Sequence, residues 1–142
     1  MKIVHLPRQL IANVTLISIG NVLRLNDEPC DVCFDFSKVY FARPSGVVLM
    51  HNITRYLLRR EWRVFYSGTK VDSKAHHFLD DIGFFEEHLK HKVWPASAHR
   101  PTTCRLIEVR NDQSVGWIEN TFVPWLSNCC KRPVGSLAPL RT

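Results

Sequence analysis

One serine in this sequence stands where many α/β proteins carry a side chain with a chemical role. Ser45 lies in the loop RPSG, residues 43–46, between an apolar stretch ending at residue 37 and a long amphipathic segment. Its hydroxyl is a candidate phosphoacceptor. Its oxygen can also accept a hydrogen bond from a backbone N–H in the first turn of a helix. The amphipathic segment favours the second role, so we expect Ser45 to be a helix N-cap.

The five cysteines are the next candidates for chemistry. Their odd number, without a recognisable signal peptide, argues against a disulfide framework. Cys30 and Cys33 have the spacing of a metal or redox pair, but the adjacent Cys129 and Cys130 do not complete a zinc ribbon. On a strand, residues three apart point to opposite faces. We therefore interpret Cys30 and Cys33 as small apolar residues.

Residues 76–91 combine four histidines with two adjacent aspartates. A metal site needs three or four converging ligands, and only His88 and His91 are spaced to meet on a helix. Asp80 and Asp81 diverge by roughly 100° on a helix, so we do not expect them to share a proton or a metal. With no glycine-rich phosphate loop and no nucleophile elbow, we predict no metal, no cofactor and no enzymatic activity.

The charge and composition admit several partners. The chain has 142 residues, of which 45% are apolar and 23% charged, ordinary values for a globular protein. Its formal net charge of +6 permits contacts with nucleic acid or with an acidic partner. One compact basic group stands out, and we interpret it as a solvated helix end. It consists of Arg55, Arg59, Arg60 and Arg63. Nucleic-acid binding by this group, and sensing of a nucleotide or anion at Ser45, are the alternatives to a protein partner.

No apolar stretch is long enough to span a membrane, and no signal peptide is recognisable, so we expect a cytoplasmic protein. Period-two apolar patterns predict strands at residues 2–6, 30–37 and 61–68. Residues 45–60 and 74–89 have helical spacing, with Gly83 ending the second helix. Strands that alternate with helices predict a mostly parallel sheet flanked by helices. Residues 8–25 fit a strand or a helix equally well.

The pattern changes after residue 92. Prolines and small polar residues predict a linker, followed by an edge strand at residues 104–111 and a helix at residues 113–128 that Pro124 kinks or shortens. We therefore divide the chain into residues 1–92 and residues 93–142. Several aromatic residues accompany the last segments, and they fit a core or a partner contact equally well. They are Phe84, Phe85, Trp94, Trp117, Phe122 and Trp125.

The order of these motifs resembles the STAS domain of bacterial anti-sigma-factor antagonists. The family pattern is a strand ending Asp-Leu-Ser, a loop Asp-Ser-Ser-Gly, a helix, a strand ending in Gly, and a helix ending in an Ile-Gly-Phe-like sequence. The matching segments are Asp35-Phe36-Ser37, the loop of residues 43–46, Gly68 and Ile82-Gly83-Phe84. The resemblance covers roughly residues 2–90 and implies that residues 8–25 form a helix.

The resemblance also implies a function. STAS antagonists bind an ATPase of the histidine-kinase-like fold, which phosphorylates a serine at the helix start and so breaks the complex. That serine falls on Ser45, whereas the family's acidic residue falls on Arg43 and its first serine on Pro44. The resemblance thus implies signal transduction by a non-catalytic regulatory module. Its partner-binding residues would be Arg43, Pro44, Ser45, Gly46 and Val47.

Residues 101–128 and 132–142 carry a second, less specific resemblance. They look like the connector of bacterial proteins in which a STAS-like domain precedes a histidine-kinase-like ATPase domain. This resemblance implies that the partner is an adjoining ATPase domain. We therefore expect an α/β, STAS-like sheet with a C-terminal strand-helix extension.

Overall fold

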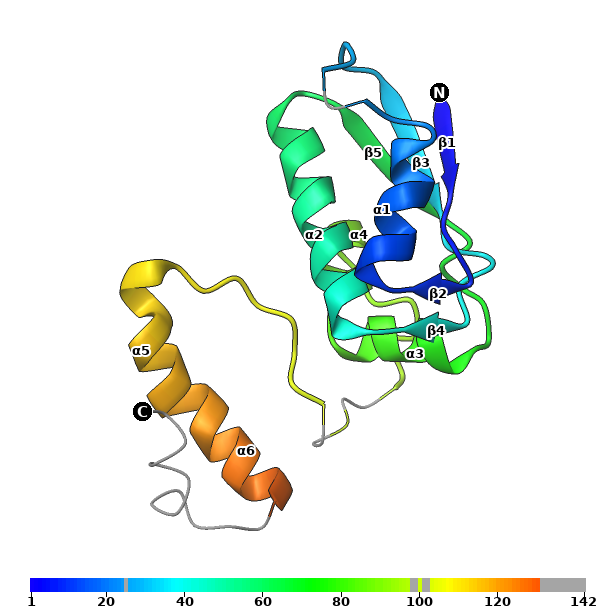
Figure 1. Cartoon of the computed structure of the whole chain (residues 1–142). Helices are drawn as coiled ribbons and strands as arrows, with labels where there is room; N and C mark the ends of the chain where they lie inside the picture. Colours follow the sequence, from blue (N-terminus) through cyan, green and yellow to red (C-terminus); the bar gives the residue numbers. More distant parts are fainter. Residues whose placement is uncertain (25, 98–99, 101–102, 131–142) are drawn as a thin grey trace. The chain divides into compact units, whose positions relative to one another are not determined.

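Alternating apolar residues form three parallel strands at the centre of the first part of the chain (Figure 1). The strands are β1 (Lys2–His5), β3 (Asp31–Asp35) and β5 (Arg63–Ser67), in the order β1-β3-β5. The structure is a computed structural model and describes residues 1–24, 26–97, 100 and 103–130. The predicted parallel sheet is confirmed.

The strands alternate in burial: β1 and β3 contain buried residues on one face, and β5 half-buries Val64 and Tyr66. Val4, Val32 and Phe34 are fully buried, and Phe36 continues this face beyond the end of β3, as the period-two pattern predicts. Ile3, which points to the opposite face, is exposed. The core therefore lies on one face of the sheet.

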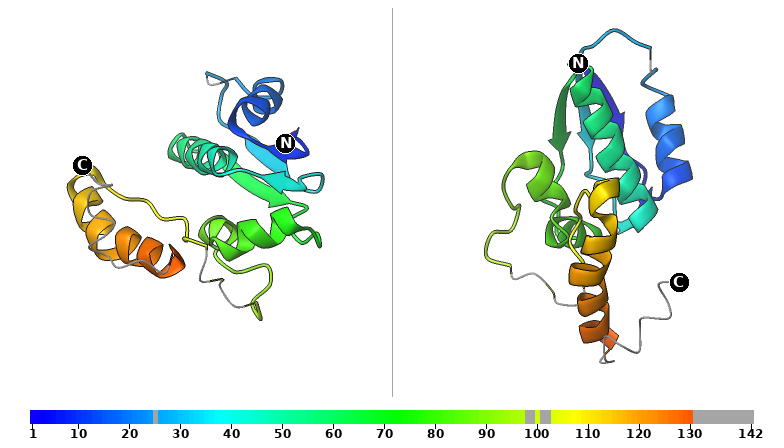
Figure 2. Two further views of the ribbon diagram at one scale, coloured as in Figure 1. Left: turned by 60° about the horizontal axis from the view of Figure 1, so that its bottom comes forward. Right: turned by 90° about the vertical axis from the view of Figure 1, so that its left-hand side faces the viewer.

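Two helices cover that face. α1 (Ala12–Gly20) connects β1 to β3, and α2 (Pro44–Arg59) connects β3 to β5. The two helices contact each other and lie side by side against the sheet (Figure 2). Residues 8–25 fitted a strand or a helix equally well, and the segment contains both. A strand of two residues comes first, and α1 follows it.

That strand belongs to a second, smaller sheet that the sequence patterns did not reveal. β2 (Gln9–Leu10) pairs in parallel with β4 (Phe41–Ala42). Two residues are too few to show a period-two pattern, so this pairing becomes visible only when the fold brings the segments together.

The last helices of this part are α3 (Lys74–Asp81) and α4 (Phe84–Leu89). Gly83 separates them with a φ of +83°, so the predicted stop at this glycine is confirmed. The buried Asp80 accepts hydrogen bonds from the N–H groups of Val93 and Trp94, at 2.8 and 3.1 Å. These bonds tie residues beyond the expected boundary at residue 92 to the first part of the chain.

The chain divides into two units, Met1–Ser97 and Ala98–Thr142. In the second unit, the edge strand expected at residues 104–111 is absent: residues 104–110 have no regular structure, and Asn111–Gln113 is a 3₁₀ turn. A strand needs a neighbouring strand for its hydrogen bonds, and none accompanies this segment among the described residues.

A helix follows this turn in three consecutive parts: α5 (Ser114–Trp117), the π-helical segment Ile118–Phe122 and α6 (Val123–Cys130). The irregular segment directly precedes the part that contains Pro124, a residue without a backbone N–H. Across the described residues, no helix has the length and apolar character needed to cross a membrane.

Candidate interaction surface

The small β2–β4 sheet holds the start of α2. The N–H of Arg43 donates to the carbonyl oxygen of Leu10 at 3.0 Å, directly after β4. One turn into the helix, Gly46 packs so closely on the same strand that a Cβ would lie 2.1 Å from the Leu10 oxygen. Only glycine permits this approach. The turn that carries Ser45 is therefore fixed by backbone contacts.

Ser45 is not the N-cap that its position in the sequence indicates. Arg43 is the N-cap residue and makes no side-chain capping bond, while Pro44 takes the first helical position and Ser45 the second. The fixed φ of proline suits this first position, and it moves the helix start ahead of the serine. Ser45 is exposed. Its hydroxyl thus faces solvent in the first turn of α2.

The five residues expected to bind a partner do not share one surface. Arg43, Pro44 and Ser45 are exposed, whereas Gly46 and Val47 are buried. The last two support the turn from inside because they pack against the β2–β4 sheet and the core. The accessible part of the expected surface is residues 43–45.

Two aromatic residues, which the sequence reasoning missed, extend this surface. Tyr40 is 50% exposed and Phe41 is 41% exposed. The guanidinium of Arg8 lies 4.9 Å from the ring centre of Tyr40, and that of Arg43 lies 5.6 Å from the ring centre of Phe41. Such stacking holds the cations over the rings. The sequence feature that could have indicated this surface is the pair of adjacent aromatic residues between Lys38 and Arg43.

The basic group predicted from the sequence lies around the opposite end of α2. Arg59 and Arg60 are exposed there, and Arg60 donates to the hydroxyl of Tyr56 at 2.8 Å. Arg55 is half-buried one turn earlier. Arg63 belongs to β5 and lies 3.6 Å from the carboxylate of Asp31. The group is therefore split between a helix end and a sheet face, and one member lies beside an acid.

The histidines pair differently from the expectation. Nδ1 of His51 on α2 lies 2.9 Å from Nε2 of His88 on α4. His91 instead contacts the carbonyl oxygen of Lys92, at 3.2 Å. Helical spacing placed His88 near His91, but α4 ends at Leu89, so they do not share a helix. In the part of the chain that the structure describes, no three His, Cys, Asp or Glu side chains are grouped to hold a metal ion.

Asp35 organises the end of β3. Its carboxylate accepts from the N–H of Ser37 at 2.9 Å and lies 2.8 Å from Nδ1 of His5. Burial raises the pKa of Asp35, but the hydrogen bonds from Ser37 and His5 outweigh burial and hold its pKa below the ordinary value. The carboxylate therefore stabilises the turn between β3 and β4.

Most of the aromatic residues singled out in the sequence pack against other aromatic rings of their own unit. Phe84 and Phe85 are fully buried, and both pack against Phe36. In the second unit, Phe122 packs between Trp117 and Trp125, with ring centres 5.5 and 5.8 Å away. The two phenylalanines belong to the core, which decides the open alternative in their case.

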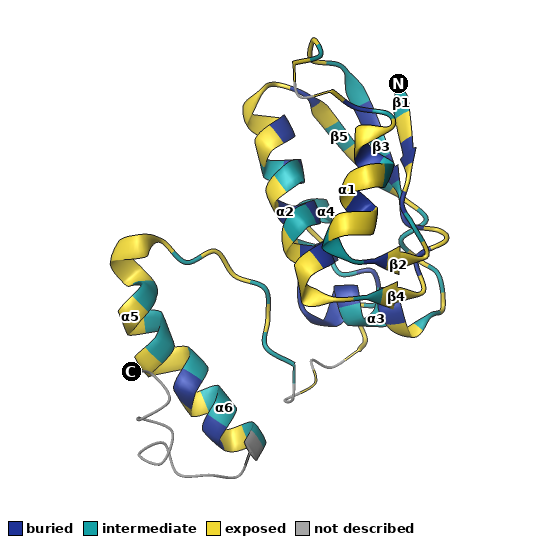
Figure 3. Ribbon diagram, in the orientation of Figure 1, coloured by how far each residue is buried: buried dark blue, intermediate teal, exposed yellow. Residues whose placement is uncertain are grey.

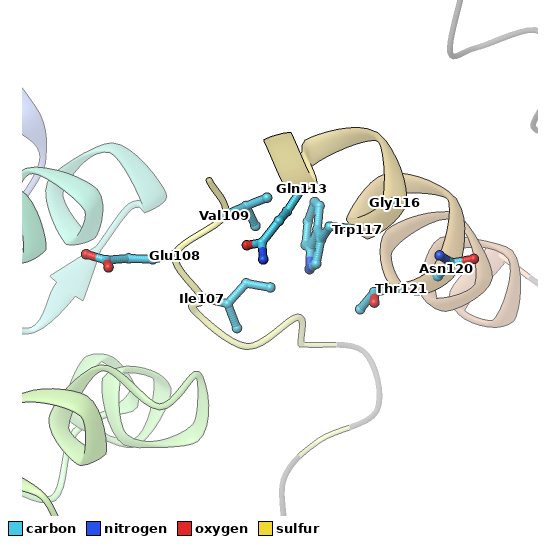
Figure 4. A pocket seen from close by; sticks show the side chains of 8 residues that line it. All are labelled: Ile107, Glu108, Val109, Gln113, Gly116, Trp117, Asn120 and Thr121. Atoms are coloured by element: carbon cyan, nitrogen blue, oxygen red, sulfur yellow. The ribbon is translucent and has the colours of Figure 1, made fainter. Parts of the chain in front are cut away.

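The second unit also contains a cavity of about 460 Å³ (Figure 4). Ile107 and Val109 lie on one side of it, and Gln113, Trp117 and Asn120 on the helical side. The indole N–H of Trp117 is buried and has no hydrogen-bond partner among the described residues. This cavity is separate from the start of α2 in sequence and belongs to a different unit.

No protein-family model, no curated protein and no solved structure matches this chain. The α/β assignment therefore rests on the topology itself, a parallel sheet in the order β1-β3-β5 with flanking helices. Residues 101–102 and 132–142, which carry part of the second resemblance, lie outside the described residues.

Proposed function

We propose that this chain is a non-catalytic regulatory module of the STAS-like type. It binds a protein partner, a histidine-kinase-like ATPase that is either separate or adjoining, through the exposed start of α2. The observation that carries the proposal is the turn of residues 43–45, which is exposed but anchored on Leu10 by backbone contacts. A rigid, accessible turn loses little conformational entropy on binding.

Residues that match the STAS pattern support the proposal because they lie where one helix or strand ends and the next segment begins. Asp35 ends β3 and binds the backbone of Ser37. Gly68 follows β5 with a φ of +63°, and a Cβ there would lie 2.6 Å from the nitrogen of Ser37. Gly83 separates α3 from α4. Asp35, Gly68 and Gly83 therefore each have a physical role at a position that the resemblance singles out.

Ser45 provides a means of regulation. A phosphate on its exposed hydroxyl would add about 1.5 to 2 negative charges at the N-terminal end of α2 and beside Arg43. The charge of the binding turn would change from basic to acidic, and we expect the complex to dissociate. Phosphorylation requires a hydroxyl that the kinase can reach. Ser45 is exposed, whereas the hydroxyl of an N-capping serine is hydrogen-bonded to the backbone of the first helical turn.

Binding is tested with the purified histidine-kinase-like ATPase domains of the source organism, including any that the same gene encodes downstream. Isothermal titration calorimetry should detect binding of the wild-type chain to one of them. Arg43→Glu should weaken binding by about tenfold or more, because it places like charges or unpaired groups in the contact. Lys70→Glu, an exposed change outside the surface, should leave the affinity within about threefold. Absence of binding to every domain would contradict the proposal.

Phosphorylation is tested separately. The chain is incubated with the ATPase domain that binds it and with Mg-ATP, and its intact mass is measured. We expect a gain of one phosphate in the wild-type chain and none in Ser45→Ala. A gain that persists in Ser45→Ala would place the modification elsewhere, and no gain, while a known STAS pair gains phosphate in parallel, would remove the switch.

A further inference from the structure

Acidic residues are missing from one layer of the first unit. Residues 6–26 and 36–60 contain β2, α1, β4 and α2, together with seven of the chain's 19 Lys and Arg residues. None of its 13 Asp and Glu residues lies in these two ranges. The acids of this unit instead follow α1, as Asp27 and Glu28 do, follow α2, as Glu61 does, or belong to the sheet and to the α3–α4 region. The helical layer is therefore uniformly basic.

Several cations of this layer have no acidic partner. Arg8, Lys38, Arg43 and Arg59 are exposed, and within the described residues none of the four forms an ion pair. Their mutual repulsion is unfavourable for folding in isolation. A binding partner that supplies negative charge would remove this repulsion.

Exposed apolar side chains belong to the same two helices. On α1, Leu16 and Ile17 are 56% and 66% exposed, while the same helix buries Thr15 towards the core. On α2, Val48 and Tyr56 are also exposed. Figure 3 shows exposed stretches, in yellow, on both α1 and α2. Because α1 and α2 lie side by side, these apolar groups are carried by one layer. Apolar area removed from water contributes about 25 cal/mol per Å², so this layer gains from being covered.

We propose that this basic-apolar face binds an acidic amphipathic helix of a protein partner. The face is defined by Leu16, Ile17, Arg43, Val48, Tyr56 and Arg59. The inference rests on the proposed function, a protein-binding module, and names the chemistry that the partner must present. Carboxylates of the partner pair with Arg43 and Arg59, and its apolar side chains cover Ile17 and Val48.

The spacing along α2 fits one helix of the partner. Val48, Tyr56 and Arg59 recur at helical intervals on the outer side of α2, and residues 43–59 span roughly 24 Å at 1.5 Å per residue. The guanidinium group binds a carboxylate through two parallel hydrogen bonds, which gives orientation as well as affinity. Arg43, the N-cap residue, and Arg59, the last residue of α2, thus mark the two ends of the face.

The aliphatic groups favour protein over the other anionic partners. Single-stranded nucleic acid binds mainly through bases stacked on aromatic rings. Three of the four apolar residues of the face, Leu16, Ile17 and Val48, are aliphatic, and only Tyr56 offers a ring. A bilayer surface binds a helix with one continuous apolar side. These apolar residues are instead distributed over two helices, and those on α2 share their helix with Arg55 and Arg59. Nucleic acid and anionic membranes are therefore alternative outcomes of the test.

The probes are three synthetic amphipathic helices of about 18 residues, long enough for the roughly 24 Å between the arginines. They share one apolar face, and their polar faces are all Glu, all Gln or all Lys. Fluorescence anisotropy with the full chain should give a Kd for the Glu helix about tenfold or more below that for the Gln helix. The Lys helix should not bind.

Matched variants locate the contact. Arg43→Glu/Arg59→Glu should weaken binding of the Glu helix by about tenfold or more, and so should Ile17→Asn. Lys70→Glu/Lys74→Glu changes the net charge equally but lies outside the face, so its effect should stay within about threefold. Circular dichroism checks that each variant is folded.

The outcomes separate this inference from the proposed function. Equal binding of the Glu and Gln helices, or equal effects of the two double variants, would overturn the acidic partner. Tighter binding of polyuridylate or of phosphatidylserine vesicles than of the Glu helix would also overturn it. Binding of an ATPase domain without preference for the Glu helix would support the proposed function and overturn this inference. Preference for the Glu helix without binding of any ATPase domain would support this inference and contradict the proposal that the partner is an ATPase.

Discussion

The starts of α2 and α3 each carry a serine, and the two serines do different things. The oxygen of Ser73 accepts from the N–H of His76 at 3.1 Å and lies 2.6 Å from Nδ1 of the same residue. At α2, Pro44 begins the helix and Ser45 is exposed in its first turn. The hydroxyl of Ser73 forms hydrogen bonds within the fold, whereas Ser45 is exposed to solvent. The difference separates residues that maintain the structure from residues that can meet a partner.

The largest effect is expected at the contact that fixes the start of α2. Gly46→Ala places a Cβ 2.1 Å from the backbone oxygen of Leu10, so β2 or α2 must move. We expect a loss of about 3 kcal/mol in the free energy of unfolding, measured by urea denaturation. Gly20→Ala is the control because a Cβ there meets nothing within 4 Å, and it should be neutral or slightly stabilising. Equal stabilities would show that the turn is not held by this contact.

Two buried threonines extend the comparison. The hydroxyl of Thr54 lies 2.5 Å from that of Tyr66, whose pKa is raised by burial, whereas the hydroxyl of Thr15 has no partner among the described residues. Thr54→Val leaves the Tyr66 hydroxyl buried and unpaired, so we expect a loss of about 2 kcal/mol. Thr15→Val removes an unpaired buried hydroxyl and should stabilise the protein by about 1 kcal/mol. Thermal and urea unfolding measure both, and two changes of the same sign would contradict the comparison.

The start of α3 should also respond to pH. Nε2 of His76 donates to the carbonyl oxygens of Phe36 and Gly68, at 2.9 and 3.0 Å, and Nδ1 accepts from the hydroxyl of Ser73. Burial lowers the pKa of His76 below 6.5. The unfolded chain then binds the proton more readily, so stability should fall as the pH decreases below about 6.5.

This pH dependence can be assigned to one residue. A single proton limits the slope to about 1.4 kcal/mol per pH unit. Urea unfolding between pH 7.5 and pH 5 should give a flatter profile for His76→Gln than for the wild type. His77→Gln, whose ring lies beside the exposed Asp72, serves as the control. A wild-type slope that survives in His76→Gln would place the titrating group elsewhere.

The smallest effects concern the two serines themselves. Ser73→Ala removes a helix cap and should cost about 1 kcal/mol. Ser45→Ala removes an exposed hydroxyl at the second helical position and should change stability by less than about 0.5 kcal/mol. Urea denaturation of both variants compares them directly. A cost at Ser45 as large as that at Ser73 would restore the N-cap interpretation.

Local patterns were sufficient for the elements that bury a continuous face. Val32, Phe34 and Phe36 alternate strictly, and β3 follows from that alternation. The helical spacing of residues 45–60 corresponds to α2, and Gly83 ends α3 because its backbone can adopt a positive φ. In these cases the information lies within a few neighbouring residues.

Other features depended on segments far apart in the sequence. Residues 104–110 alternate like a strand, but in the part of the chain that the structure describes they have no neighbouring strand with which to pair. His88 meets His51, from a helix more than 30 residues away, instead of His91. Such contacts follow from the packing of elements, which a periodic pattern does not encode.

The sequence by itself therefore determined the alternation of strands and helices, the parallel sheet and the basic, acid-free composition of residues 36–60. The tertiary structure decided which residues of that segment are accessible: Ser45 faces solvent because Pro44 begins the helix, and Gly46 is buried because it packs on Leu10. The physical reason is range. Propensity and periodicity act over a few residues, whereas burial and hydrogen bonding depend on what the folded chain brings together.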